Sequence, residues 1–306
     1  MIGFVLRRLA GAIPTIFIIV TVAFFMIRAA PGGPFDLERP IDPLIMQNIN
    51  AAFNLDKPLW QQYVLYLGNV LQGDFGPSFT RRDFSVADLF RLGLPVSVQL
   101  GALALLLALL VGATLGVIAA LRQNKGADYA VVGIATFGIT IPNFVVAPVL
   151  SLLFGVWMGW LPAGGWGTPA HMVLPVVTLA LPQIAIIARL TRGATIEALR
   201  SNHVRTARAY GLPTRVVVIT HTLRAAILPV VSYLGPAAAA LLTGSVVVET
   251  IFGIPGIGRY FVQGALARDY TLVMGTVIVI ALFVVIFNLL VDIAYAVLDP
   301  RVRYES

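Results

Sequence analysis

Long, nearly uninterrupted apolar stretches dominate the chain and are separated by shorter polar segments. Each stretch has about the 20 residues that an α-helix needs to cross roughly 30 Å of hydrocarbon. Six stretches are predicted to span a membrane: Leu9–Ile27, Pro95–Leu121, Tyr129–Gly159, Met172–Leu190, Ile227–Val248 and Leu272–Leu298. The pattern therefore predicts an all-α polytopic membrane protein with six transmembrane helices.

Composition supports this prediction. Hydrophobic residues make up 58% of the chain and charged residues 11%, against about 25% charged residues in soluble domains. A soluble domain with six buried helices would need more polar surface than the linkers provide. Arg7 and Arg8 before an apolar run also fit a secretory signal peptide, but the run is too long and five more follow it. There is no cysteine, which excludes disulfides and thiolate chemistry.

The positions of the positive charges predict the orientation in the membrane. The net charge is +7, and Lys and Arg favour cytoplasmic loops near the membrane. Basic pairs precede the first span and follow the second and the sixth, whereas the loop at residues 160–171 has none. The largest group lies at or between spans four and five: Arg189, Arg192, Arg200, Arg205, Arg208, Arg215 and Arg224. We expect both termini and the loop at residues 191–225 to be cytoplasmic.

Three parts of the chain follow from this topology. Residues 1–29 form the cytoplasmic N-terminus and first span, residues 30–94 an extracytoplasmic segment, and residues 95–306 a core of five spans. Prolines and glycines in "PGGPFDLERPIDP" predict a loop at the start of the extracytoplasmic segment. Apolar side chains then recur at helical spacing, which predicts a short amphipathic helix: Trp60, Tyr63, Val64, Leu67 and Leu71. Its interpretation stays open between a cap over the bundle and a contact for a delivery partner.

Several prolines fall inside the predicted spans: Pro142, Pro148, Pro175, Pro182 and Pro236. Membrane bundles tolerate such prolines because neighbouring helices and local adjustments satisfy the freed carbonyl groups. Kinked spans suit a cavity or a moving gate, although prolines are common in such helices anyway.

The sequence lacks the motifs of several enzyme classes. It has no P-loop for ATP, and neither H-E-x-x-H nor G-x-S-x-G. His171, His203 and His221 lie at span ends or in the basic loop, without partners at motif spacing. No catalytic or metal-binding residue is therefore predicted. The basic cluster is sparse and lies against a membrane, so anionic lipid is favoured over nucleic acid as its partner.

The basic loop contains signals for a short helix, a break and a second helix. Ser201 and Asn202 are favoured N-cap residues, Gly211 is typical of a position just past a helix end, and Pro213 is well placed to open the next helix. A short helix of this kind is stable only when something packs on it.

One face of this helix has a composition suited to a partner. Val204, Ala207, Arg208 and Gly211 fall three or four residues apart and so share a face. Small residues there allow a partner to approach the backbone, while Arg205 and Arg208 can reach acidic groups. The alternative is a helix that lies on the lipid surface and docks nothing.

The loop resembles the cytoplasmic coupling loop of ABC-importer permeases, on the stretch "RTARAYGLPTRVVVITHTLRAAILPVVSYLGP". The general motif is Glu-Ala-Ala, three residues, Gly, nine residues, Ile, one residue and Leu-Pro. Here Arg205-Thr206-Ala207 replaces Glu-Ala-Ala, Gly211 keeps the glycine, His221 and Leu223 take the Ile and Leu positions, and Arg224 replaces the proline. The dipeptide/oligopeptide/nickel permease family shows these same departures.

The resemblance extends along the chain through "MIRAAPGGPF", "GDFGPSF", "GWLPAGGW", "ETIFGIPGIGR", "RDYTLVMG" and "VDIAYAVLDPRVRY". These stretches are similar to those of the B-type permease subunit of oligopeptide ABC importers. "GGPFDLER" and "GDFGPSF" favour the oligopeptide version, with permeases for dipeptides, nickel or glutathione as the alternative.

The resemblance implies a fold, a location and partners. The fold is the type I permease fold of ABC importers, with an extracytoplasmic insertion between helices 1 and 2, in the bacterial cytoplasmic (inner) membrane. The partners are a C-type permease subunit, two cytoplasmic ATPase subunits that bind ATP and Mg²⁺, and an extracytoplasmic peptide-binding protein. This chain itself needs no cofactor. The residues implied in coupling to an ATPase are Val204, Arg205, Thr206, Ala207, Arg208, Gly211 and Leu223.

Other polar and small residues in the spans are weaker candidates. Asn288, Asp292, Tyr295 and Asp299 share one face of span six, which suggests an inner gate or a structural network with a loop arginine. The small-residue run "GPAAAALLTGS" in span five predicts close helix packing. Glu249 at the outer end of span five is left open between a peptide amino terminus and the sister chain as its partner.

Two other classes of function remain as alternatives. A stand-alone ion-coupled secondary transporter normally has acidic groups at mid-membrane depth, and no ladder of such groups is seen here. A membrane scaffold without transport would leave the coupling loop without a role.

Overall fold

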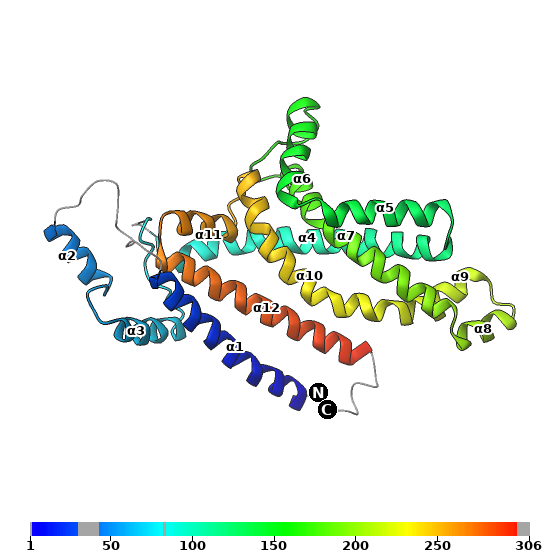
Figure 1. Ribbon diagram of the computed structural model, residues 1–306, viewed down its shortest axis with the longest axis horizontal. Coiled ribbons are helices and arrows are strands. Elements are labelled where there is room, and N and C mark those ends of the chain that lie inside the picture. The colour runs from blue at the N-terminus through cyan, green and yellow to red at the C-terminus, as the bar shows by residue number, and fades with distance from the viewer. Residues whose placement is uncertain (1, 30–42, 82–83, 299–306) are drawn as a thin grey trace.

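The computed structural model describes residues 2–29, 43–81 and 84–298, which form an elongated bundle of helices (Figure 1). In this part of the chain the β-structure is limited to an isolated bridge between Pro77 and Ser85, so the all-α prediction is confirmed. The elements are α1 Ile2–Ala29, α2 Pro43–Ala52, α3 Leu59–Leu71, α4 Val86–Leu121, α5 Gly126–Thr140, α6 Asn143–Leu150, η1 Ser151–Trp157, α7 Pro169–Leu199, α8 Asn202–Ala209, α9 Thr214–Val216, η2 Val217–Thr222, α10 Leu223–Phe252, α11 Ile257–Leu266 and α12 Tyr270–Leu298.

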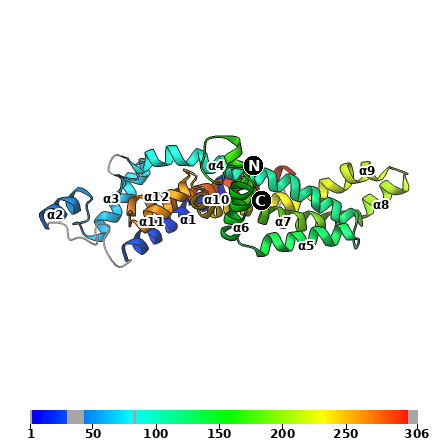
Figure 2. The same cartoon turned by 90° about the horizontal axis from the view of Figure 1, so that it is seen from above.

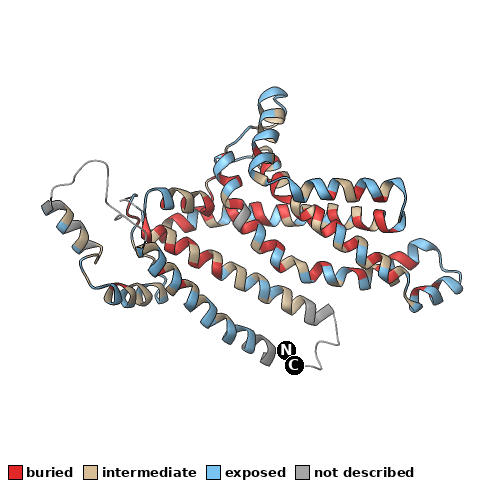
Figure 3. Cartoon of the chain, viewed as in Figure 1, coloured by how far each residue is buried: buried red, intermediate tan, exposed pale blue. Residues whose placement is uncertain are grey.

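The core lies where α4, α7 and α10 pack together, as the concentration of buried residues in Figure 3 shows. Leu100 of α4, Leu179 and Ile187 of α7, and Phe252 of α10 are almost fully buried. Helix α1 lies beside α12, outside this core, and most of its side chains from Arg7 to Ala29 are exposed. The exposed apolar side chains of α1 suit contact with lipid or with other membrane helices.

The predicted spans are largely confirmed, with one difference. Among the described residues, α1, α4, α7, α10 and α12 are long and apolar enough to cross a membrane. The third predicted span, Tyr129–Gly159, is instead two helical segments, because α5 and α6 with η1 meet at an angle of 102°. Figure 1 shows α6 projecting from the side of the bundle while α5 lies along it.

The break in the third span occurs at Pro142. The proline ring disfavours helical geometry in the residue before it, and Ile141 is extended with φ −86° and ψ 117°. Pro148, Pro175, Pro182 and Pro236 lie inside helices. Proline alone therefore does not determine where a span breaks in this chain.

The helices extend beyond the predicted spans. Helix α4 begins nine residues before Pro95, at Val86, where Ser85 and Asp88 form a reciprocal capping box. Helix α7 continues to Leu199, so the first residues of the predicted 191–225 loop are helical. The prediction followed hydropathy, which reports membrane depth, whereas helix ends depend on caps and breaks.

Helix α3 packs against the bundle through a face that differs in part from the predicted one. Tyr63 and Leu67 are partly buried against the cluster that Val20 and Phe24 of α1 form with Met274 and Ile278 of α12, as expected. Trp60, Val64 and Leu71 are instead 64%, 58% and 87% exposed. Periodicity showed that the segment is a helix but did not identify its buried side, because apolar residues lie on more than one face.

The small-residue run in α10 packs closely, as predicted. A Cβ added at Gly235 would lie 2.6 Å from Asn288 Oδ1 of α12, and Ala237 and Ala238 are buried. Figure 2 shows that α8 and α9 lie at one end of the molecule and α2, α3 and α11 at the opposite end. We call the end that carries α8 and α9 the loop end.

Candidate functional site

Helix α8 forms where the sequence predicted a short helix at the loop end. Ser201 occupies the N-cap position, with φ −68° and ψ 156°. Its hydroxyl does not cap the helix but donates 2.6 Å back to the Ala198 carbonyl. That hydrogen bond fastens the start of α8 to the end of α7.

The break after α8 depends on backbone geometry. Gly211 has φ +76°, in the left-handed region that glycine adopts without steric cost. Its N–H donates 2.9 Å to the Arg208 carbonyl. Pro213 is the N-cap of α9. Gly211 therefore follows the end of α8, and Pro213 opens the next helix, as predicted.

The side chains of α8 divide into a buried and an exposed face. Val204 is fully buried and Ala207 is 6% exposed, and both pack with Leu199 and Val217 of this same chain. Helix η2 folds back and covers Val204 and Ala207, so these two side chains are not exposed at the surface of this chain. The sequence pattern of α8 did not predict this burial, because the covering residue, Val217, belongs to η2 and not to α8.

The exposed face of α8 is basic and aromatic. Arg205, Thr206 and Arg208 are exposed, as is Gly211, and Tyr210 is 82% exposed. Leu223 is half-buried at the start of α10, away from this face. We call Arg205, Arg208 and Tyr210 together the basic face.

Helix α8, which carries the basic face, is held in place by contacts with η2. The His203 ring Nε2 donates to the His221 backbone carbonyl at 3.3 Å, which joins α8 to η2. Val217 and Thr222 of η2 are fully buried. The loop is therefore a packed extension of α7 and α10.

The predicted polar network on α12 is present only in part. Asp292 Oδ2 lies 3.1 Å from Arg8 Nε, so its cationic partner comes from α1 and not from a loop as expected. Asn288 packs against Gly235 of α10. The side chain of Tyr295, and Asp299 altogether, lie outside the described residues. The sequence did not indicate Arg8 as the partner of Asp292, because the two residues lie at opposite ends of the chain and come together only in the fold.

A cavity of about 330 Å³ lies between α1 and α12 beside this ion pair. Its polar lining residues are Arg7, Arg8, Thr15, Asn288 and Asp292. The Arg8 and Asp292 side chains are 56% and 26% exposed. A pair this open to solvent contributes little to stability.

Glu249 lies inside the protein, away from either partner considered for it. It is fully buried and accepts hydrogen bonds from Ser97 Oγ at 2.7 Å and from the Gly258 and Arg259 N–H groups at 2.8 and 3.3 Å. These contacts satisfy the carboxylate within this chain, so neither a peptide amino terminus nor the sister chain is needed as its partner. The carboxylate instead joins α4 and α10 to the first turn of α11, where the positive end of the helix dipole favours an anion.

Asp269 is a second buried carboxylate, which sequence reasoning missed. It is fully buried and accepts from Ser78 Oγ, Thr80 N–H and Thr80 Oγ1 of the connector before α4. It also accepts from Leu272 N–H in the first turn of α12, at 3.1 Å. Asp269 thus joins "GDFGPSF" to "RDYTLVMG", two motifs that the sequence presents only separately.

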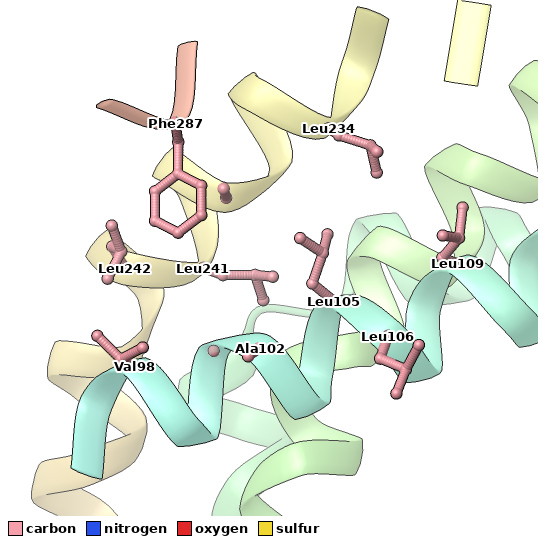
Figure 4. A pocket seen from close by; sticks show the side chains of 11 residues that line it. Val98, Ala102, Leu105, Leu106, Leu109, Leu234, Leu241, Leu242 and Phe287 are labelled. Atoms are coloured by element: carbon pink, nitrogen blue, oxygen red, sulfur yellow. The ribbon is translucent and has the colours of Figure 1, made fainter. Parts of the chain in front are cut away.

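An apolar cavity of about 260 Å³ opens between α4, α10 and α12. Figure 4 shows Leu105 of α4 facing Leu241 of α10 and Val98 of α4 on the side of Leu242, with Phe287 of α12 over one side. Its lining offers almost no polar atoms, so it does not suit a charged or strongly polar ligand.

The long apolar helices and their packing define a multi-pass helical membrane protein. The sequence profile of the family described as "Binding-protein-dependent transport system inner membrane component" matches residues 112–304. The profile of its N-terminal region matches residues 1–85. The chain belongs to this family, which places it in the inner membrane.

Named relatives align along nearly the whole chain. The oligopeptide transport system permease protein OppB of Escherichia coli (strain K12) is 52% identical over 99% of this chain and 100% of its own length. The protein of the same name from Haemophilus influenzae is 49% identical over the same shares. The dipeptide transport system permease protein DppB of Bacillus subtilis is 43% identical over 100% of this chain and 99% of its own.

A solved structure supports the fold. The crystal structure of an amino acid ABC transporter with histidines matches with a TM-score of 0.55 and 19% sequence identity. The match covers 68% of this chain and 94% of that chain. At this identity the likeness concerns the fold alone.

Proposed function

We propose that the chain is the B-type permease subunit of an ATP-driven oligopeptide importer. The observation that carries this proposal is the 52% identity to an oligopeptide permease over 99% of the chain. The subunit provides half of the translocation pathway, pairs with a C-type permease subunit, and receives peptide from an extracytoplasmic binding protein. Both termini and the loop end face the cytoplasm in this proposal.

The basic face of α8 is the proposed contact with a cytoplasmic ATPase subunit. Helix α8, which carries this face, lies at one end of the molecule (Figure 2), where a groove in a partner can enclose it. Arg205 and Arg208 offer charge-assisted hydrogen bonds to carboxylates, and Tyr210 offers a large amphipathic surface. Two ATPase subunits, with ATP and Mg²⁺ bound on them, hydrolyse the nucleotide, and this chain is not itself an enzyme.

A dipeptide permease is the second candidate, because the Bacillus subtilis dipeptide permease is 43% identical over the full length. The lower identity ranks it behind the oligopeptide assignment. The two are separated by competition in the complete assembly, where unlabelled longer peptides should suppress uptake of a labelled oligopeptide more strongly than dipeptides do.

Reconstitution tests the proposal. The chain alone in liposomes should move no peptide, and uptake should require the C-type subunit, both ATPase subunits, the binding protein and ATP. Copurification in mild detergent should recover the same partners. Uphill peptide uptake by the lone chain in an ion gradient would identify a secondary transporter and reject the importer assignment.

A further inference from the structure

Arg192 and Asp128 form a two-pronged ion pair between α7 and α5. Arg192 Nε donates to Asp128 Oδ1 at 2.5 Å, and Nη2 donates to Oδ2 at 2.8 Å. Asp128 is 2% exposed, and the Arg192 side chain is 28% exposed. Bidentate pairs fix orientation as well as distance, so this contact holds the two helices in one alignment.

The same carboxylate also fixes the turn between α4 and α5. Asp128 Oδ2 accepts from the Asn124 backbone N–H at 2.8 Å. Asn124 has φ +60°, a left-handed conformation that asparagine tolerates better than most residues. Asp128 therefore ties Arg192 to the entire hairpin of α4 and α5.

Helix α4 meets α7 at the same level. A Cβ added at Gly116 would lie 2.6 Å from the Ala188 carbonyl oxygen and from Thr191 Cβ. The last turns of α7 are thus held by a close backbone contact on α4 and by an ion pair on α5.

The other end of this connection is α8. The Ser201 hydroxyl bonds to Ala198 at the end of α7, and Val204 packs on Leu199. These contacts connect α8 directly to the end of α7. From there two contacts lead into the bundle, the close packing on α4 at Gly116 and the ion pair with Asp128 on α5.

We infer that the Arg192–Asp128 pair is the positioning contact that transmits movement of α8 to the hairpin of α4 and α5. The role assigned to the pair is the alignment of α7 with α5, without contact with peptide or nucleotide. The inference rests on the proposed function, because it assumes that an ATPase subunit moves α8. It assigns a coupling role to an arginine whose charge would otherwise be attributed to membrane orientation alone.

Neutral variants in the complete assembly provide the first test. Asp128→Asn and Arg192→Gln remove the charges, and Asp128→Asn keeps the side-chain shape and an acceptor for Asn124. Both should assemble normally with the ATPase subunits. Stimulation of ATP hydrolysis by loaded binding protein, and peptide moved per ATP, should fall by about tenfold, within the range typical of coupling between sites. Arg192→Lys keeps the charge but cannot form both parallel hydrogen bonds of the guanidinium, and it should retain part of the stimulation of ATP hydrolysis.

Arg91→Gln is the matched control. It removes an arginine from an exposed pair with Asp88, at 3.5 Å, where the Arg91 side chain is 82% exposed. This variant should keep wild-type coupling. The wild-type assembly in the same experiment tests the proposed function separately, because it must show peptide uptake and stimulated hydrolysis.

A reversible cross-link distinguishes lost coupling from misfolding. The chain has no cysteine, so Asp128→Cys with Arg192→Cys can be joined by a bifunctional thiol reagent and released by reduction. The cross-linked assembly should recover stimulated hydrolysis and lose it again on reduction, while each single cysteine variant with the same reagent should not recover. Full coupling in the neutral variants, or a formed cross-link that restores nothing, would overturn the inference.

Discussion

The Ser78 hydroxyl donates a 2.5 Å hydrogen bond to the carboxylate of Asp269, 191 positions away in the chain. The acceptor is fully buried and caps the first turn of α12. One side chain thus holds the connector before α4 against the connection between α11 and α12. The arrangement at the end opposite the loop end depends on it.

Asp269→Ala should destabilise the protein by about 2 kcal/mol, because the buried Ser78 hydroxyl would lose its acceptor and the exposed Thr80 would lose two hydrogen bonds. Thermal unfolding in detergent measures the effect. Asp74→Ala is the control, since Asp74 is exposed and its carboxylate accepts from the neighbouring Gly76 N–H. Equal melting temperatures for the two variants would contradict the role given to Asp269.

Gly116→Ala should weaken the packing of α4 on α7 by about 1–3 kcal/mol, the usual cost of overpacking, because the new methyl group meets backbone at 2.6 Å. Gly133→Ala in α5 provides the matched helical control, since no atom lies within 4 Å of its added Cβ. That control should be neutral or more stable by up to about 1 kcal/mol. Unfolding temperatures that fall equally would show that α4 and α7 are packed differently.

Gly211→Val should strain the break after α8 by about 1–3 kcal/mol, since φ is +76° and the added Cβ meets nothing within 4 Å. Membrane abundance should stay normal while ATPase association and peptide uptake fall. Gly193→Val carries the same change at an exposed helical glycine with open space around it and should keep most uptake. Equal uptake in both variants would contradict the claim that peptide uptake requires the left-handed backbone at Gly211.

Ala207→Glu should disrupt α8 itself, because it places a carboxylate in the contact with Val204 and Val217, where an unpaired charge is costly. Limited proteolysis of membranes opened to the protease should cut the loop faster in this variant. Arg208→Glu, on the exposed face, should leave the proteolysis rate unchanged and weaken ATPase association. Faster cleavage in Arg208→Glu as well would contradict the assignment of buried and exposed faces.

Single cysteines test the orientation, since the chain has none of its own. Leu266→Cys, at a position 83% exposed in α11, should react with an impermeant thiol reagent from outside intact cells. Thr214→Cys, exposed at the loop end, should react only after the membrane is opened. Gly164 is unsuitable as a probe because its Cβ would lie 2.8 Å from the Phe252 carbonyl oxygen. Reversed labelling would overturn the topology and the coupling proposal with it.

The features readable from the sequence are those determined by local composition. Hydropathy located the spans, and Gly211 with Pro213 marked the break after α8, because glycine and proline act on the backbone where they stand. The bend in the third span could not be predicted from the sequence. Pro142 and Pro148 are both inside one apolar run, and only the first sits at a break, so tertiary contacts decide between them.

Contacts between residues that are far apart in the sequence leave no local pattern from which they can be predicted. Asp128 with Arg192 and Asp269 with Ser78 are separated by 64 and 191 positions, and no short motif contains both members. The buried face of α8 was assigned to a partner for the same reason, since Val217 covers it from the following helix. Burial of a short helix is a property of the segments that fold onto it.

The 102° bend between α5 and α6 bears on the order in which the chain is assembled during synthesis. Helix α5 has 15 residues, or about 22 Å at the helical rise, and so falls short of roughly 30 Å of hydrocarbon. The apolar run is long enough to enter the membrane as one segment, but α6 packs on α7 and α10. Since α10 begins at Leu223, α6 reaches its final position only after most of the chain has left the ribosome. The final shape of the third span therefore depends on contacts with a helix that is synthesised later.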